Sequence, residues 1–311
     1  MQQATLPLIL RPYLSHLEKQ HSVESIGRVN EAFELAESVY GNKRHWTGMS
    51  LLEHAIVLLE RLMPYEPDDD AVVSCLLIHA LETKEVGIEE IEERFGTVVR
   101  SIVSGVHLLS HVSAAGKHMT LENKRLMFLR VSDDIRIVLL ILLKREIALE
   151  HLEKISKEDQ RRLAREIMQL FAPVAARLGM YGIKHRLESG AFPVAYPVDH
   201  EMVTEQLARL RESKGDFLPL VCRKLQQELA AEGIAARVEG RQKQPYSLFR
   251  KLQQKGLARI EQLFDLFAIR VIVESEQDCY RALGVLHRVG HPVKNRFKDF
   301  VAFPKPNGYQ S

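Results

Sequence analysis

Cysteine is scarce in this sequence, which has only three among its 311 residues. Cys75, Cys222 and Cys279 lie far apart, and an odd number does not suit a set of disulfides. Closely spaced cysteine pairs, which structural zinc sites require, are missing. The scarcity argues against a disulfide framework or a zinc finger and fits a chain that stays in the reducing cytoplasm.

Long apolar runs are also missing. The longest, IRIVLLILL at Ile135–Leu143, is about half as long as the roughly 18 apolar residues of a membrane span. The first residues do not combine a basic start with a long apolar stretch, so we expect no signal peptide. These absences predict a cytoplasmic protein without a membrane partner.

What is present suits a globular protein. Hydrophobic residues make up 46% of the chain and charged residues 27%, and 311 residues suffice for two domains. The formal net charge of +2 says little by itself. The distribution of charge and of turn residues along the chain says more.

Residues 1–195 have the pattern of a helical domain. Apolar residues recur at spacings of three and four, as in SLLEHAIVLLERLM, and no strand-like alternation occurs. The pattern predicts helices at 50–63, 71–81, 121–130, 133–152 and 157–178, with two more separated by Gly96. The prolines of Pro193–Asp199 then predict a domain boundary.

The sequence pattern changes in residues 196–311. Two more helices are expected at 200–212 and 215–232, and IAARVEGR then alternates like a strand. A second, buried strand is expected at Leu266–Val273, and a helix at Glu276–Val289. The order strand, helix, strand predicts an α/β sheet in this half.

A basic segment, GRQKQPYSLFRKLQQK, covers Gly240–Lys255. Arg241 and Lys243 fall at the expected strand end, and Lys251 lies one helical turn beyond Ser247. Phosphate groups prefer such a combination of guanidinium, ammonium and hydroxyl donors. The segment therefore indicates a phosphate site, although a solvated basic helix face would have the same pattern.

Asp265 stands at the start of the otherwise apolar segment FDLFAIRVIV. A carboxylate there is costly unless it is paired or binds a metal, and a phosphate site needs an oxygen ligand for Mg²⁺. Arg270, five residues on, points to the opposite face of an ideal strand. Asp265 is thus a candidate Mg²⁺ ligand, and the alternative is a structural ion pair with Arg270 or a neighbouring lysine.

The last segment, NRFKDFVAFPKPNGYQS, adds cations at Arg296, Lys298 and Lys305. Tyr309 follows an Asn-Gly turn signal and offers a ring on which a base can stack, for about 1–3 kcal/mol. The pattern suits a ligand-binding loop better than a loose tail.

These motifs, in this order and spacing, resemble the synthetase domain of the RelA/SpoT family of guanosine tetra- and pentaphosphate synthetases. The helical half resembles the hydrolase domain of the same family. The resemblance implies an α+β multidomain protein: an all-α, HD-type hydrolase-like domain at 1–195, then an incomplete α/β, nucleotidyltransferase-like synthetase domain at 196–311. It also implies the reaction, a transfer of pyrophosphate from ATP to the 3′-hydroxyl of GTP or GDP.

The resemblance also implies the roles of single residues. Asp265 would bind Mg²⁺ and act with Lys251 in catalysis, and Arg241 and Arg270 would enclose the adenine. Lys243, Ser247 and Lys251 would hold the ATP phosphates. The GTP or GDP would contact Lys298, Lys305, Asn307 and Tyr309.

The family pattern continues beyond Tyr-Gln-Ser to a histidine and then to a strand with a catalytic glutamate, whereas this sequence ends at Ser311. We therefore expect a fragment without synthetase turnover of its own. We also expect the loop that holds Lys305, Asn307 and Tyr309 to be poorly ordered.

In the helical half, the resemblance implies a metal site that has lost most of its ligands. His54 matches a retained ligand, while Ile78 and His79 stand where a His-Asp pair belongs. If the alignment shifts by one residue, His79 and Ala80 take these places, and the aspartate is missing in either case. Glu82 matches a catalytic glutamate, but Lys144 falls where the last carboxylate is required. Because an ammonium group repels a metal ion, we expect no metal and no hydrolysis here. The combination is similar to the synthetase-only RelA type.

Other histidines of this half allow weaker interpretations. His107 and His111, four residues apart, would share a helix face, but no third ligand is evident, so a solvated face is the simpler interpretation. Arg44 and His45 fall where the family's hydrolase domain contacts its nucleotide.

Two alternatives stay open. The first is a metal-dependent hydrolase with a rearranged ligand set of His54, His79 and Glu82. The second is a catalytically inert fragment that only binds nucleotide or other parts of its chain. For a full-length protein the resemblance implies the ribosome and C-terminal regulatory regions as partners.

Overall fold

The structure, a computed structural model, describes residues 23–115, 134–215, 217–263, 265–293, 297–306, 308 and 310. The chain separates into two compact units, a helical unit, Met1–Tyr196, and a sheet unit, Pro197–Ser311. In the described ranges no helix is both long and apolar enough to cross a membrane. The expected helix at 121–130 lies outside the described residues.

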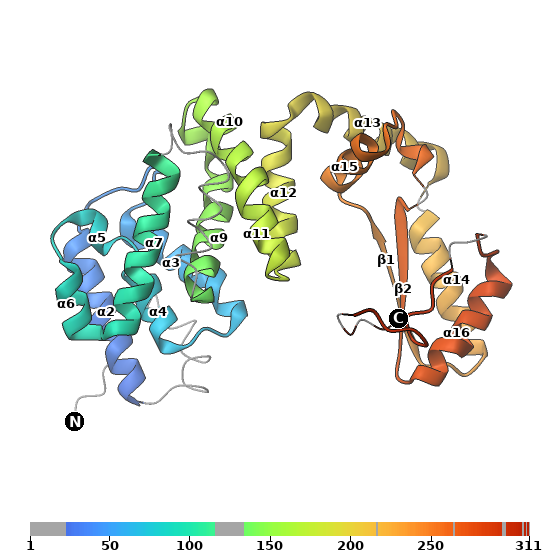
Figure 1. The fold of residues 1–311 in the computed structure, drawn as a ribbon, viewed down its shortest axis with the longest axis horizontal. Coiled ribbons are helices and arrows are strands. Elements are labelled where there is room, and N and C mark those ends of the chain that lie inside the picture. Colours follow the sequence, from blue (N-terminus) through green and yellow to red (C-terminus); the bar gives the residue numbers. More distant parts are fainter. Residues whose placement is uncertain are drawn as a thin grey trace. The chain divides into compact units, whose positions relative to one another are not determined.

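The helical unit is built from helices of moderate length (Figure 1). The first half of it contains α2 (Val23–Tyr40), α3 (Leu51–Leu62), α4 (Asp69–Leu76), α5 (Ala80–Thr83), α6 (Ile88–Phe95) and α7 (Thr97–Ala115). The second half contains α9 (Ile135–Glu150), α10 (Lys157–Glu166), α11 (Ala172–Arg177) and α12 (Tyr181–Ala195). Short 3₁₀ turns at Met63–Tyr65 and Leu152–Lys154 follow α3 and α9.

Local sequence explains where two of these helices begin. Ser50 and Glu53 form a reciprocal capping box at the start of α3, which satisfies two backbone amides that the helix itself leaves unpaired. Asp134 accepts a hydrogen bond from the Arg136 amide at the start of α9, as expected of an aspartate at a helix N-cap. Both caps matter for function because α3 and α9 carry candidate site residues.

Helices α7 and α9 approach each other closely at Gly105. A Cβ atom at this position would lie 2.6 Å from Cδ1 of Ile137, so a larger residue does not fit. Both Gly105 and Ile137 are buried. The contact fixes the spacing of the two helices that carry Ser110 and Lys144.

The helix expected at 71–81 is interrupted. Helix α4 ends at Leu76 and α5 begins at Ala80, with Leu77–His79 between them. The hydroxyl of the buried Tyr40 donates to the Leu76 carbonyl at 2.7 Å and accepts from the His79 amide at 3.0 Å. The Tyr40 hydroxyl takes the place of a hydrogen bond within the helix. The helix is therefore interrupted, although the apolar pattern of residues 71–81 suits a continuous helix.

The helix expected at 157–178 is continuous but irregular. Between α10 and α11, residues Ile167–Phe171 form a π-helical turn. Such turns insert one residue into a helix and occur frequently at functional sites. Phe171 lies under the guanidinium of Arg145, with 4.7 Å from its Cζ to the ring centroid.

In the described residues of the sheet unit, β1 (Ala236–Gln242) and β2 (Phe267–Val273) pair antiparallel, with Glu239 opposite Arg270. Its helices are α13 (Pro197–Lys214), α14 (Phe217–Ala231), α15 (Pro245–Lys255) and α16 (Glu276–Val289), with a 3₁₀ turn at Ile260–Gln262. The predicted class, an all-α part followed by a smaller α/β part, is confirmed.

One face of the sheet carries the core of this unit. Helices α14 and α16 lie on the same side of the strands (Figure 1). Leu229, Ile234, Ala282 and Val285 form a buried cluster against which alternate strand residues, such as Val238 and Val271, pack. The other face carries the remaining set, Arg237, Glu239, Arg241, Ala268, Arg270 and Ile272, as the alternation along a strand requires.

Candidate functional site

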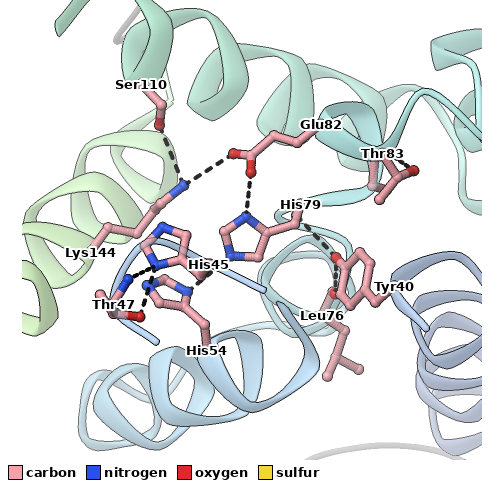
Figure 2. A network of polar contacts seen from close by, with 11 residues as sticks. Tyr40, His45, Thr47, His54, Leu76, His79, Glu82, Thr83, Ser110 and Lys144 are labelled. Carbon is pink, nitrogen blue, oxygen red and sulfur yellow. Dashed lines mark hydrogen bonds and ion pairs between the residues drawn. The ribbon is translucent and has the colours of Figure 1, made fainter. Parts of the chain in front are cut away.

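Four predicted residues of the helical unit meet in one polar cluster (Figure 2). His54 comes from α3, His79 from the break before α5, Glu82 from α5 and Lys144 from α9. His54 and His79 are almost completely buried, with 1% and 0% of their surface exposed. We call the series Lys144–Glu82–His79–His54 the polar chain.

Each member of the polar chain contacts the next. Lys144 Nζ lies 3.8 Å from Glu82 Oε1, and His79 Nδ1 lies 2.9 Å from Glu82 Oε2. His79 Nε2 lies 2.9 Å from His54 Nδ1. Because a carboxylate only accepts, we assign the proton of His79 to Nδ1. Its Nε2 then accepts from His54 Nδ1–H.

The environment keeps the histidines neutral and the carboxylate charged. Burial lowers the pKa of His54 and His79, because the imidazolium form loses its hydration. Burial alone would raise the pKa of Glu82, but the hydrogen bond from His79 and the charge of Lys144 outweigh it and lower the pKa to about 2. Burial lowers the pKa of Lys144, whereas Glu82 acts in the opposite direction. The polar chain thus contains one ion pair, between Lys144 and Glu82. The neutral imidazoles of His79 and His54 orient the carboxylate of this pair.

Three further side chains complete the cluster. His45 lies against His54 with ring centroids 4.1 Å apart, and its Nδ1 lies 2.9 Å from Thr47 Oγ1. Burial, helped by His79 and Lys144, lowers the pKa of His45 to about 3. Lys144 also donates to Ser110 Oγ at 3.4 Å.

The members of the polar chain do not fit a divalent metal. The ammonium of Lys144 lies against Glu82, where it would repel a cation. Both ring nitrogens of His79 are engaged by His54 and Glu82, so a metal would have to break one of these bonds. Within the described ranges no three His, Cys, Asp or Glu side chains are grouped as ligands of one ion.

The other predicted positions of this half are less central. Ile78 is a core residue, 1% exposed. His107 and the half-exposed loop residue Arg44 line a cavity beside the polar chain, whereas the side chain of His111 lies outside the described residues. Thr83, next to Glu82, donates its hydroxyl to the Ala80 carbonyl at 2.7 Å.

In the sheet unit, Asp265 meets two of the predicted phosphate-binding lysines. It lies in the turn just before β2 and not within the strand, and Lys243 and Lys251 both contact its Oδ2. Burial would raise the pKa of Asp265, but the two lysines lower it to about 2. The structure thus shows the ion pair with neighbouring lysines that the sequence also allows, and among the described residues none donates to the other oxygen, Oδ1.

The remaining residues that the sequence predicts for an ATP site lie in α15 and in the two strands. Ser247 lies in the first turn of α15, one turn before Lys251. Arg241 pairs with Ala268 and Arg270 with Glu239, so the register places both arginines on the face opposite α14 and α16. Asp265 precedes β2 (Phe267–Val273), so the alternation along the strand does not fix its direction relative to Arg270.

The predicted GTP-site residues are only partly described. Lys298 and Arg270 line a cavity of about 410 Å³ beside β2. The ammonium of Lys305 lies over the ring of Phe300, 4.6 Å from its centroid. Asn307 and Tyr309 lie outside the described residues, as does Arg296.

Several residues that contact the polar chain or line its surroundings were not predicted from the sequence. Tyr40, Thr47 and Ser110 are ordinary helix or loop residues by their pattern, and only the fold brings them to the polar chain. Arg145 carries a weak signal, because it continues an apolar helix with a second cation next to Lys144. A charge inside such a helix is costly and therefore suggests a partner.

Comparison with known proteins adds two family matches. Residues 32–181 match the HD domain, and residues 240–311 match the region found in RelA/SpoT proteins. The polar chain lies within the first match, and Lys243, Lys251 and Asp265 lie within the second.

The curated relatives that the chain resembles are longer proteins. A guanosine-3′,5′-bis(diphosphate) 3′-pyrophosphohydrolase of Aquifex aeolicus is 34% identical over 97% of this chain and 42% of its own length. The GTP pyrophosphokinase rsh of Brucella ovis is 34% identical over 91% and 38%, and the GTP pyrophosphokinase of Streptomyces coelicolor 33% over 92% and 34%. The chain thus spans about two fifths or less of the length of these relatives.

Proposed function

The chain belongs to the RelA/SpoT family, and from this premise we propose that its sheet unit binds ATP for pyrophosphate transfer to the 3′-hydroxyl of GTP or GDP in the cytoplasm. The synthetase domain would comprise residues 196–311, and the hydrolase-like domain residues 1–195. The contact of Asp265 with both Lys243 and Lys251 is the observation that carries this proposal.

The chemistry of the cluster supports the proposal. Pyrophosphate transfer needs positioned phosphates and neutralised charge rather than a covalent intermediate. Lys243 and Lys251 would exchange their contact with Asp265 for contacts with phosphate oxygens, helped by the hydroxyl of Ser247. Mg²⁺ on Asp265 would neutralise the charge that develops on the transferred group.

The sheet face supports an adenine site next to these phosphates. Arg241 and Arg270 are exposed on the same face, and a guanidinium plane can stack on an adenine ring. Lys298 and Lys305 would contribute to the guanosine nucleotide site together with Asn307 and Tyr309. For the whole protein, the ribosome and C-terminal regulatory regions are further proposed partners.

We propose further that the helical unit does not hydrolyse the alarmone, as in the synthetase-only RelA type. Lys144 supports this, because it places an ammonium group where a metal-dependent hydrolase of this family would need a carboxylate ligand for its metal. The competing proposal, hydrolysis with His54, His79 and Glu82 as a ligand set, draws on the relative named a pyrophosphohydrolase. Stoichiometric Mn²⁺ in purified protein, with hydrolysis that EDTA abolishes, would favour the competing proposal.

The ATP site is tested by charge reversal at Lys251. We expect Lys251→Glu to weaken the binding of ATP in the presence of Mg²⁺ at least tenfold, since it places a carboxylate beside Asp265 and the phosphates. Lys224→Glu is the matched control, because Lys224 is exposed on α14, which covers the opposite face of the sheet. Equal ATP affinity in the two variants, measured by calorimetry, would contradict the site assignment.

A further inference from the structure

Residues 297–306 form a loop that carries Lys298 and Lys305, the two described lysines of the proposed guanosine nucleotide site. Both lysines are exposed. A site binds a nucleotide in one geometry only if its donors are fixed, and a loop fixes a donor less precisely than a helix or a strand does. This loop therefore needs anchors on the rest of the sheet unit.

Helix α16 provides two such anchors. The hydroxyl of Tyr280 donates to the carboxylate of Asp299, at 3.2 Å from Oδ2 and 3.4 Å from Oδ1. Seven residues further along α16, the ring of His287 lies against the ring of Phe297, with centroids 6.2 Å apart. Residues seven apart share one face of a helix. One face of α16 thus contacts the chain on both sides of Lys298.

Helix α16 is itself well anchored. Its residues Ala282 and Val285 belong to the buried cluster on which the strands pack. Ser275 caps its first turn, and Arg281 donates to the Glu232 carbonyl at 2.8 Å. A group that is bonded to this helix therefore takes a defined position relative to the sheet.

Asp299 connects this anchor to the turn that follows it. Its Oδ1 accepts from the amides of Val301 and Ala302, at 3.0 and 2.9 Å. Its carbonyl accepts from the amide of Phe303 at 3.3 Å. This is the pattern of an N-cap, in which a side-chain oxygen satisfies the first free amides of a helical turn. The carboxylate that shapes the turn is thus the group that Tyr280 holds.

The capped turn also positions the second lysine. Phe300 stands directly after Asp299, and the ammonium of Lys305 lies over its ring, 4.6 Å from the centroid. Such a contact is weak at an exposed site, so it orients the ammonium group and still leaves it available to a phosphate. Lys298 directly precedes Asp299 in the chain. The positions of both lysines therefore depend on this one carboxylate.

We propose that Tyr280 and Asp299 are positioning residues of the guanosine nucleotide site. Asp299 shapes the turn that presents Lys298 and Lys305, and Tyr280 fixes this turn to α16. Neither residue contacts the nucleotide. The hydrogen bonds to Asp299 also disperse its negative charge, which reduces its repulsion of a phosphate beside Lys298. The assignment rests on the proposed function of the sheet unit and adds to it the groups that hold its two lysines.

The test measures the Kd of GDP and of ATP by calorimetry, each in the presence of Mg²⁺. We expect Tyr280→Phe, which removes one hydrogen bond, to raise the Kd of GDP about three- to tenfold. Asp299→Ala, which removes the cap as well, should raise it about tenfold or more. Neither variant should change the Kd of ATP. Tyr181→Phe, at an exposed position of α12 in the helical unit, is the matched control and should change neither Kd.

The conservative variant Asp299→Asn separates positioning from charge. The amide oxygen of asparagine can accept from both backbone amides, and its NH₂ group can donate to the Tyr280 hydroxyl. We therefore expect the Kd of GDP to stay close to that of the unaltered chain. An equal loss of affinity in Asp299→Asn and Asp299→Ala would refute the positioning role, because it would show that the negative charge itself is required.

A double variant tests whether the two residues act as one unit. If Tyr280 acts through Asp299, then Tyr280→Phe should no longer weaken GDP binding once Asp299 is replaced by alanine. Additive effects in the double variant would contradict the proposal. An unchanged Kd of GDP in Tyr280→Phe, or an equal rise in the Kd of both nucleotides, would overturn it.

Failure of the proposed function has a different signature. No binding of GDP by the unaltered chain would overturn the guanosine nucleotide site itself, and this assignment with it. Unchanged ATP affinity in Lys251→Glu would overturn the ATP site and would leave the comparison of GDP affinities intact. Binding of GDP with equal affinity in Tyr280→Phe and the unaltered chain would overturn the positioning role alone.

Discussion

Removing the ammonium of Lys144 should destabilise the helical unit, because Glu82 would keep its charge without a counter-ion. At 3.8 Å and an effective dielectric constant of about 20, the attraction between the two groups is about 4 kcal/mol. Loss of one partner of a buried ion pair costs about 3–5 kcal/mol, and we lower this to about 2–3 kcal/mol because the Glu82 side chain is 27% exposed. Lys144→Met keeps the apolar stem and so isolates the charge.

A double-mutant cycle measures the interaction itself. Glu82→Gln keeps an acceptor for His79 and removes the charge, so the double variant should lose less stability than the sum of the losses in the two single variants. We expect a coupling free energy of about 1–3 kcal/mol. Urea unfolding followed by Trp46 fluorescence reports on the helical unit alone, since the chain has no other tryptophan. A coupling below about 0.5 kcal/mol would refute the view that these groups form one electrostatic unit.

Three other perturbations address the same unit. Tyr40→Phe removes the hydroxyl that joins the two sides of the α4–α5 break and leaves the His79 amide unsatisfied, so it should cost about 1–3 kcal/mol in urea unfolding; a loss below 0.5 kcal/mol would contradict this. Gly105→Ala places a methyl group 2.6 Å from Ile137 and should lower the melting temperature, whereas Gly27→Ala, where no atom lies within 4 Å, should not. Stability should also fall as the pH drops from about 6.5 towards 3. In the folded protein the pKa of His45 is lowered to about 3, and the pKa values of His54 and His79 are lowered too. In this pH range the unfolded chain therefore binds more protons than the folded one. Each of these histidines contributes up to about 1.4 kcal/mol per pH unit, and a flat profile between pH 7 and 5 would exclude neutral imidazoles.

The sequence predicts those features that depend on neighbouring residues. The capping residue Asp134 and the alternation of β1 follow from local pattern, and the spacing of Ser247 and Lys251 places them one turn apart in α15. The strand expected at 266–273 is observed at Phe267–Val273, with Asp265 in the turn before it. The contacts of Asp265 with both Lys243 and Lys251 depend on the pairing of distant segments and do not follow from this local pattern.

Features made by distant residues could not be predicted. The break before His79 depends on a hydroxyl that lies 39 positions earlier in the chain. The place of Arg145 on Phe171 depends on a π-helical turn, and the apolar pattern of this segment is equally compatible with a regular helix. The fold can therefore be inferred largely from periodicity, whereas the site requires the tertiary structure.

The polar chain has a consequence for how this sequence can evolve. A single return from Lys144 to aspartate would set two carboxylates against each other with no cation between them. A return to aspartate at Ile78 alone would bury a carboxylate at a position that is only 1% exposed. Either of these two substitutions made alone would therefore give a less stable protein.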